Sequence, residues 1–188
     1  MKKRNLIFSV ILIMLLAVNS SLFAYSGGSG TEGEPYQIAT TDDLIKLSTT
    51  SSDWDKYFIQ TANISFDEDE NQVDWDGVAG PDGNGTSGFS PIGNRSTNFT
   101  GNYAGDEHTI DNLYINRPYT DYIGLFGFIK NATITNTGVT NVNMTGKDYL
   151  GGLVGANSST ISNSYSTGSV DGDELVPCPI SFANETGN

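Results

Sequence analysis

The chain has 188 residues, 22 of them glycine, and only 16% of its residues are formally charged. Helix-forming residues are scarce and turn-forming and strand-forming residues are frequent, which argues against a helical bundle or a coiled coil and favours a β-rich fold. The formal net charge of −13 argues against nucleic-acid binding, because neutralising phosphates requires a basic surface.

Residues 1–24 have the pattern of a secretory signal peptide. Three basic residues precede an apolar stretch that runs from Leu6 to Val18, and the small residue Ala24 suits a cleavage site. An uncleaved membrane anchor is the alternative, although about 13 apolar residues are few for a hydrocarbon core about 30 Å thick. No later segment is apolar enough to cross a membrane, so we expect a secreted or cell-surface protein.

Residues 25–98 are expected to form an N-terminal cap and the first strands. Thr40 and Asp43 resemble a capping box, so a short helix is predicted over residues 41–49. Its apolar face would cover the open end of a stack of strands. The alternation of apolar and polar residues over 57–66 predicts an early strand.

The segment from residue 67 to residue 82 carries seven carboxylates. A D-x-D-x-N sequence begins at Asp67, but Gln72 stands where an EF-hand needs glycine, and Val78 stands where it needs a bidentate glutamate. We therefore reject an EF-hand. A looser calcium site remains a hypothesis, and a solvated acidic loop is the alternative. The calcium hypothesis rests on Asp74, Asp76 and Asp82.

A repeat organises residues 99–170. The sequence T-I-x-N begins at Thr109, Thr133 and Thr160, so its copies are 24 and 27 residues apart. Units of this length that are rich in glycine, asparagine and β-branched residues favour short strands over paired helices. We predict that each unit is one coil of a β-solenoid, in which the strands of neighbouring coils pair in parallel.

Equivalent residues of the three units are predicted to lie above one another. The isoleucines would form an interior stack, and burying each one contributes roughly 1.5 to 3 kcal/mol. The asparagines two residues later would form a ladder whose amides satisfy backbone groups at the coil corners. The alternative is an exposed asparagine row that binds a ligand. The residues are Ile110, Ile134 and Ile161, and Asn112, Asn136 and Asn163.

The last two units share a longer pattern. Residues 121–127 parallel residues 148–155, with one glycine inserted. The segment 151–157, GGLVGAN, resembles the GLUG-motif repeats of secreted bacterial surface proteins, and residues 30–64 and 88–113 are similar to the sequence that precedes such repeats. The resemblance, which covers about residues 30–170, implies an adhesin-like or other non-catalytic role.

No residue is assigned a catalytic, cofactor-binding or metal-binding role. His108 and Cys178 are the only histidine and cysteine, and a dyad would need the first T-I-x-N coil to meet the C-terminal tail, so His108 is interpreted as a corner residue. No G-x-S-x-G elbow is present. Arg95, Arg117 and Lys130 could serve a polysaccharide-active enzyme, but no pattern groups them. We therefore do not expect an enzyme.

Six tyrosines offer stacking faces for sugars or for an adhesive surface. Tyr122 and Tyr149 are equivalent by repeat, which favours a shared structural role for that pair. The six are Tyr103, Tyr114, Tyr119, Tyr122, Tyr149 and Tyr165.

The tail, residues 171–188, lacks the repeat pattern and carries prolines on both sides of Cys178. It is interpreted as a cap or as the sign of a truncated product.

The predicted fold is all-β, a right-handed parallel β-helix with a short N-terminal capping helix. The expected function is a structural or adhesive module, secreted or on the cell surface, that binds an extracellular glycan or protein. The alternatives are a calcium-assisted polysaccharide-active enzyme and the non-catalytic N-terminal part of a larger secreted protein such as a protease.

Overall fold

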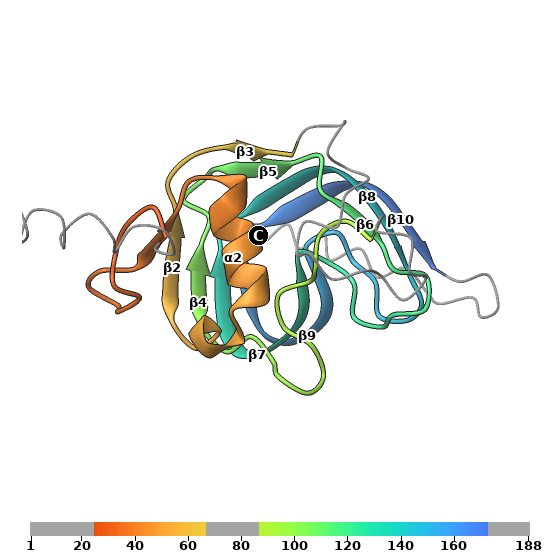
Figure 1. Ribbon diagram of the computed structural model, residues 1–188, viewed down its shortest axis with the longest axis horizontal. Helices are drawn as coiled ribbons and strands as arrows, with labels where there is room; N and C mark the ends of the chain where they lie inside the picture. The colour runs from red at the N-terminus through yellow and green to blue at the C-terminus, as the bar shows by residue number, and fades with distance from the viewer. Residues whose placement is uncertain (1–24, 67–86, 173–188) are drawn as a thin grey trace, which may run out of the picture.

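The computed structural model describes residues 25–66 and 87–172 (Figure 1). The predicted signal peptide, the carboxylates of the calcium hypothesis and residues 173–188 of the tail, which include Cys178, therefore lie outside the described residues. Within the described ranges the protein consists mostly of β-strands, with one short α-helix, α2, and one 3-10 helix, η1. The predicted β-rich class is confirmed.

The strands form two sheets in which every strand pair is parallel. The first sheet has the order β1 (Tyr36–Ile38), β2 (Tyr57–Gln60), β4 (Asn102–Ala104), β7 (Phe126–Thr135) and β9 (Val154–Ser162). The second has the order β10 (Tyr165–Gly172), β8 (Gly138–Gly146), β5 (Thr109–Asp111) and β3 (Ile64–Ser65), and β6 (Tyr114–Asn116) also pairs with β8.

The chain passes from the first sheet to the second and back, and each passage adds one strand to the first sheet and one strand, or two in the case of β5 and β6, to the second. We call the groups β2–β3, β4–β5–β6, β7–β8 and β9–β10 layers. The register places apolar residues, all of them buried except the partly buried Ile161, above one another from layer to layer. In the first sheet these are Phe58, Tyr103, Ile134 and Ile161, and in the second they are Ile64, Ile110 and Val139.

One predicted alignment is wrong. Ile134 pairs with Ile161 as expected, but Ile110 lies in the second sheet, where it pairs with Ile64 and Val139. The residue next to Ile134 in the preceding layer is Tyr103. Ile110 is nevertheless fully buried. The first T-I-x-N copy therefore occupies the other sheet, and Asn112 is not part of the predicted ladder with Asn136 and Asn163.

Five asparagines have a left-handed backbone conformation. Their φ angles lie between 49° and 59°, a region that asparagine tolerates better than most residues with a Cβ. Asn136 lies between β7 and β8, and Asn163 lies at the equivalent place between β9 and β10. The predicted position of these two asparagines at corners is confirmed. All five are Asn112, Asn131, Asn136, Asn141 and Asn163.

The core lies between the two sheets and is rich in aromatic rings. The ring centroids of Phe58 and Phe99 are 6.1 Å apart, and those of Phe99 and Phe126 are 5.0 Å apart. Tyr103 is also buried, and its hydroxyl donates to Oε1 of Gln60 at 3.2 Å. These contacts join successive layers, because each ring comes from a different part of the repeat.

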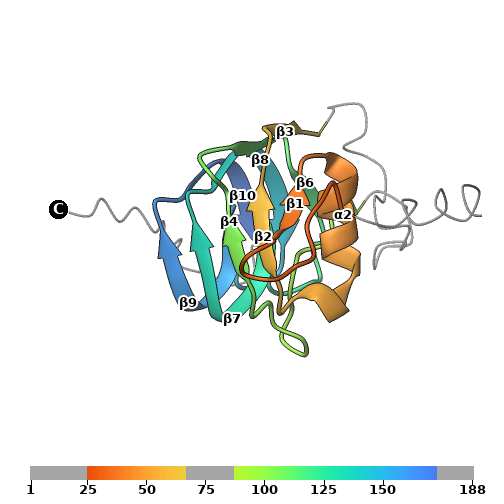
Figure 2. The same cartoon turned by 90° about the vertical axis from the view of Figure 1, so that its left-hand side faces the viewer.

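The helix α2 (Thr41–Thr49) has the predicted bounds and the predicted capping box. The Thr40 side chain accepts from the backbone N–H of Asp43, and the Asp43 carboxylate accepts from the backbone N–H of Thr40. Leu44 and Leu47 on its inner face are fully buried. Figure 2 shows α2 beside β1, at the end of the first sheet that is opposite to β9. The helix therefore lies at this end of the first sheet.

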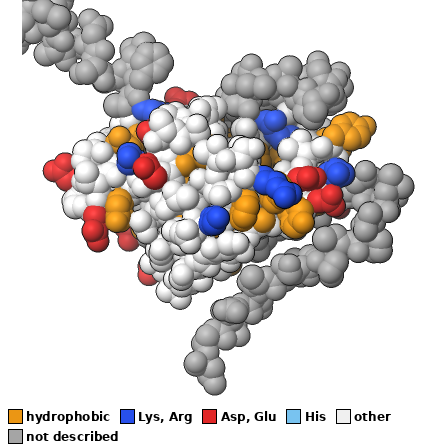
Figure 3. Space-filling model, turned by 90° about the horizontal axis from the view of Figure 1, so that it is seen from below, with side chains coloured by type: hydrophobic (Ala, Val, Ile, Leu, Met, Phe, Trp, Pro, Cys, Tyr) orange, Lys and Arg blue, Asp and Glu red, His pale blue; other side chains and the backbone are white. Residues whose placement is uncertain are grey.

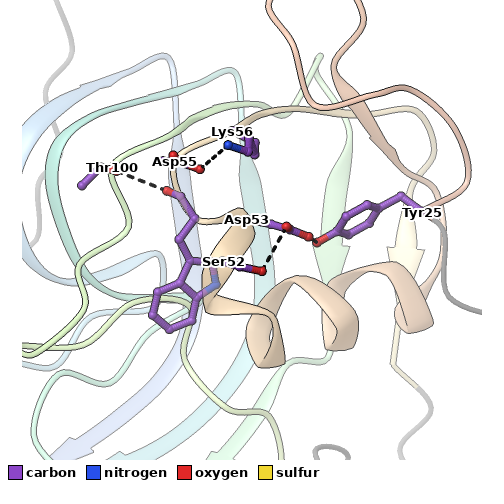
Figure 4. Close-up of polar contacts among 7 residues, drawn as sticks. Tyr25, Ser52, Asp53, Asp55, Lys56 and Thr100 are labelled. Atoms are coloured by element: carbon purple, nitrogen blue, oxygen red, sulfur yellow. Dashed lines mark hydrogen bonds and ion pairs between the residues drawn. The ribbon is translucent and has the colours of Figure 1, made fainter.

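Tyr25, the first described residue, contacts α2, β1 and the 3-10 helix that follows α2 (Figure 4). Its hydroxyl donates to Asp53, which follows α2 in η1 (Ser51–Asp53), at 3.0 Å. Its ring contacts Tyr36 at 4.5 Å between centroids, and Nζ of Lys46 lies 4.3 Å from its ring centroid. Burial, followed by the Asp53 charge, raises the pKa of the Tyr25 hydroxyl well above its ordinary value.

Candidate functional site: a stack of exposed aromatic rings

Three nearly parallel aromatic rings form a stack on the surface. The Tyr122 ring lies 5.5 Å from that of Phe128, with 11° between the planes, and 4.8 Å from that of Tyr149, with 5° between the planes. Tyr122 and Phe128 are partly exposed, and Tyr149 is 53% exposed. We call Phe128, Tyr122 and Tyr149 the tyrosine stack.

The backbone brings the two tyrosines together across successive layers. The N–H of Tyr122 donates to the carbonyl of Asp148 at 2.8 Å, and the N–H of Ile123 donates to the carbonyl of Tyr149 at 3.1 Å. Ile123 also bridges to Leu150 in parallel. The two tyrosines that are equivalent by repeat therefore lie next to each other on successive layers.

Both tyrosines have a backbone conformation that is unfavourable for a bulky side chain. Their φ angles are 65° and 59°, whereas the other non-glycine residues with positive φ are aspartate, glutamate or asparagine. A residue with a Cβ in this region costs about 1–2 kcal/mol. Such outliers persist where the surrounding structure enforces them, and they are frequent at functional sites. Asparagine or glycine would fit both places with less strain.

Charged groups surround the tyrosine stack. Nη1 of Arg95 lies 3.5 Å from the Tyr122 hydroxyl. Nζ of Lys147 lies 3.8 Å from Asp121 and 3.5 Å from Asp148, and all three of these side chains are substantially exposed. Figure 3 shows exposed hydrophobic side chains beside both basic and acidic ones on one face of the molecule. Arg95 thus contacts the tyrosine stack, and Asp121 and Asp148 directly precede its two tyrosines in the sequence.

A shallow hollow lies at a corner between the two sheets, apart from the tyrosine stack. His108 lines it together with the amides of Asn136 and Asn163 and the exposed ring of Tyr165. Nδ1 of His108 lies 3.3 Å from Oδ1 of Asn63, which also accepts from the backbone N–H of Thr109 at 3.0 Å. His108 therefore has the corner role that the sequence suggested.

The basic residues considered for an enzyme have separate surroundings. Arg95 lies at the tyrosine stack, Lys130 is exposed in β7, and Nε of the buried Arg117 donates to the carbonyl of Phe89 at 3.3 Å. Residues 25–66 and 87–172 contain no group of three His, Cys, Asp or Glu side chains that could hold a metal ion. No helix among them is long and apolar enough to span a membrane.

A comparison with protein-family models identifies the motif that forms the last layer, β9–β10. The model of the GLUG motif matches residues 148–171, from the loop that carries Tyr149 through β9 and almost to the end of β10. Residues 148–171 form a GLUG motif. One GLUG motif therefore corresponds to one layer of the fold.

Glycines of the GLUG motif and of the layer before it allow close backbone approach. A Cβ on Gly155 would lie 2.6 Å from the carbonyl oxygen of Tyr149 and 2.8 Å from that of Gly127. A Cβ on Gly124 would lie 2.7 Å from the carbonyl oxygen of Gly151. Contacts below 3.0 Å with backbone cannot be relieved by a side-chain movement, so these positions require glycine.

Two curated relatives contain a similar sequence. Halomucin of Haloquadratum walsbyi is 33% identical over 161 residues, which is 84% of this chain and 2% of halomucin. A protein of Evansella cellulosilytica described as a Gly-rich membrane protein is 31% identical over 149 residues, which is 77% of this chain and 16% of that protein. The chain thus spans a small part of both relatives. No solved structure matches it significantly.

Proposed function

We propose that this protein is a β-solenoid module, secreted or attached to the cell surface, that binds an extracellular glycan through the tyrosine stack. The all-parallel pairing of two sheets, with one layer per GLUG motif, supports a solenoid, and its right-handed sense follows from the crossover rule. The names of the two relatives, a halomucin and a membrane protein, support a surface location. The predicted signal peptide supports secretion.

The observation that carries the glycan proposal is the Tyr149 ring. It is 53% exposed, it ends a stack of parallel rings, and it is held at a φ of 59° that would suit asparagine or glycine better. The ring stacks on Tyr122, but about half of its surface remains in solvent, so this stacking does not use the whole ring. We therefore attribute the aromatic side chain at this position to recognition.

The chemistry around Tyr149 fits a sugar. A pyranose ring has an apolar face of C–H groups, which can lie flat on an aromatic ring, and hydroxyl groups around its edge. The tyrosine stack provides the flat surface, and Lys147, Asp148 and Arg95 provide donors and acceptors beside it. A partner protein would more often demand a larger apolar patch with a buried centre.

A panel of soluble polysaccharides tests the proposal on the full chain. Binding is measured by affinity electrophoresis and calorimetry, together with an assay for polysaccharide cleavage. Tyr149→Asn removes the ring and relieves the backbone, so we expect an unchanged or higher melting temperature and at least a tenfold loss of affinity. Binding without cleavage supports a recognition module, whereas cleavage would favour the polysaccharide-active enzyme.

Tyr165→Asn is the matched control. Tyr165 is also 53% exposed, but it lies at the hollow near His108 and belongs to no aromatic stack that contains Tyr149. We expect this variant to bind glycans like the wild type. Equal losses in both variants would show that the tyrosine stack is not the site, and binding of proteins alone would overturn the glycan class.

A further inference from the structure

The end of the molecule that carries the GLUG motif presents two strand edges. β9 is the last strand of the first sheet and β10 is the last strand of the second. Each pairs with the preceding layer on one side, and within residues 25–66 and 87–172 no strand pairs with the other side. Figure 2 shows β9 at the end of the first sheet farthest from α2. Unpaired N–H and C=O groups of this kind are a template for further pairing.

The opposite end is closed by several features. β1 is only three residues long, Pro35 precedes it, and Gln37 within it forms an antiparallel bridge with Gly27. The helix α2 packs beside β1. Short edge strands, proline and a covering helix are the usual means of preventing edge pairing. The fold therefore protects one of its two ends.

The open end lacks charges that would prevent pairing. β9 has nine residues, none of them charged and none of them proline, and Asp171 is the only charged residue in β10. The whole chain has a net charge of −13. A bulge at Gly168, whose φ is 130°, makes β10 less regular, so β9 is the more suitable edge.

The interior of the fold is exposed at this end. Three apolar residues of the last layer are partly exposed, while their partners one layer earlier have no exposed surface. These pairs are Ile161 with Ile134, Val170 with Met144, and Leu150 with Ile123. A partner that covered this end would bury apolar side chains as well as satisfy backbone groups.

We propose that a second copy of this chain binds there, with β9 of the two copies paired antiparallel about a two-fold axis. The partner must offer an uncharged strand edge beside an apolar interior, and the same end of a second copy offers both. A two-fold axis makes such a contact self-complementary and closed, so that a dimer forms and not a filament. Because β9 carries no charged residue, two acidic molecules can pair along it without placing like charges opposite one another.

Sedimentation equilibrium of the full chain over a range of micromolar concentrations tests the proposal. We expect a reversible monomer–dimer equilibrium, with slower hydrogen exchange of β9 amides in the dimer. Ile161→Lys places a charge on β9, at a partly exposed apolar position of the open end. Because of the two-fold axis, each copy brings one such lysine to the interface, so two like charges meet there. Association should therefore weaken at least tenfold, while circular dichroism confirms that the variant is folded.

Thr160→Lys is the matched control, because it adds the same charge to the same strand at an exposed residue next to Ile161. It should dimerise nearly as well as the wild type. A wild-type chain that stays monomeric at all concentrations would overturn the proposal, as would assemblies larger than dimers. Equal weakening by both lysines would overturn the pairing through the open end.

Discussion

Asn163 donates a hydrogen bond from its side-chain Nδ2 to Oδ1 of Asn136, which lies 3.2 Å away and one layer earlier. The two residues have φ angles of 49° and 50°. The pair thus combines a left-handed corner with an amide contact between layers. Because both features recur at the same point of the repeat, the asparagines help to hold neighbouring layers in one register.

Substitution of Asn136 separates these two contributions. Asn136→Ala removes the amide and places an ordinary Cβ at positive φ, so we expect a loss of about 1–2 kcal/mol in the free energy of unfolding. Asn136→Gly also removes the amide but accepts the backbone angle, so it should cost less. Urea unfolding measures both. A glycine variant that is as unstable as the alanine variant would contradict a conformational role.

The register of β7 is tested by two neighbouring aspartates. Ile134 is fully buried between Tyr103 and Ile161, so Ile134→Asp buries a charge without a partner and should unfold the repeat region, at a cost above about 4 kcal/mol. Thr135 is half-buried and faces the other side of the strand, so Thr135→Asp should be tolerated. Circular dichroism measures whether each variant is folded. Equal destabilisation by the two aspartates would contradict this register.

Local features of the fold were predictable from the sequence. The helix α2 depends on Thr40, Asp43 and an adjoining apolar face, all within ten residues of one another. Long-range register was not predictable in the same way. The T-I-x-N sequence around Ile110 describes a strand that ends in a corner, and both sheets contain such corners. Only the pairing of Ile110 with Ile64 and Val139 shows which sheet it belongs to.

Only part of the tyrosine stack could be predicted from the sequence. The repeat showed that Tyr122 and Tyr149 are equivalent, and their stacking follows from that equivalence. Neither the positive φ of the two tyrosines nor the exposure of Tyr149 could be deduced, because both depend on how the loop crosses the layer before it. Phe128 also joins the stack from β7, although no pattern linked it to the tyrosines.

Alkaline pH should destabilise the protein through Tyr103. Burial raises the pKa of its hydroxyl above the ordinary value of about 10, so the folded state keeps the proton when the unfolded state loses it. The contribution of Tyr103 to the free energy of unfolding is therefore fully present below about pH 10. Above that pH it falls by about 1.4 kcal/mol per pH unit. Urea unfolding between pH 9 and pH 11 measures the slope.

Tyr103→Phe is the test of that assignment. The variant should lose about 1–3 kcal/mol at neutral pH, because Oε1 of the buried Gln60 loses its donor. Its stability should also fall less steeply above pH 10. An unchanged alkaline slope would show that ionisation of other groups controls unfolding at high pH.

Asp43 joins the start of the described chain to the capping helix. Its carboxylate accepts from the backbone N–H and the hydroxyl of Ser26 at 3.0 and 2.6 Å, and from the backbone N–H of Ala39 at 3.0 Å. It also accepts from the backbone N–H and the hydroxyl of Thr40 at 3.1 and 2.9 Å. One buried carboxylate thus satisfies donors from three residues in two separate segments of the sequence.

Asp43→Asn keeps the shape of the side chain but turns an NH₂ group toward donors. We expect it to lower the free energy of unfolding by about 2–3 kcal/mol, since hydrogen bonds to charged groups are among the stronger ones. The exposed Asp42 in the same helical turn is the control, and Asp42→Asn should cost at most about 1 kcal/mol, the value of a charge near a helix N-terminus. Because the Ser26 amide depends on Asp43, its hydrogen exchange should accelerate in the first variant alone. Similar stabilities for the two variants would show that Asp43 acts only through the helix dipole.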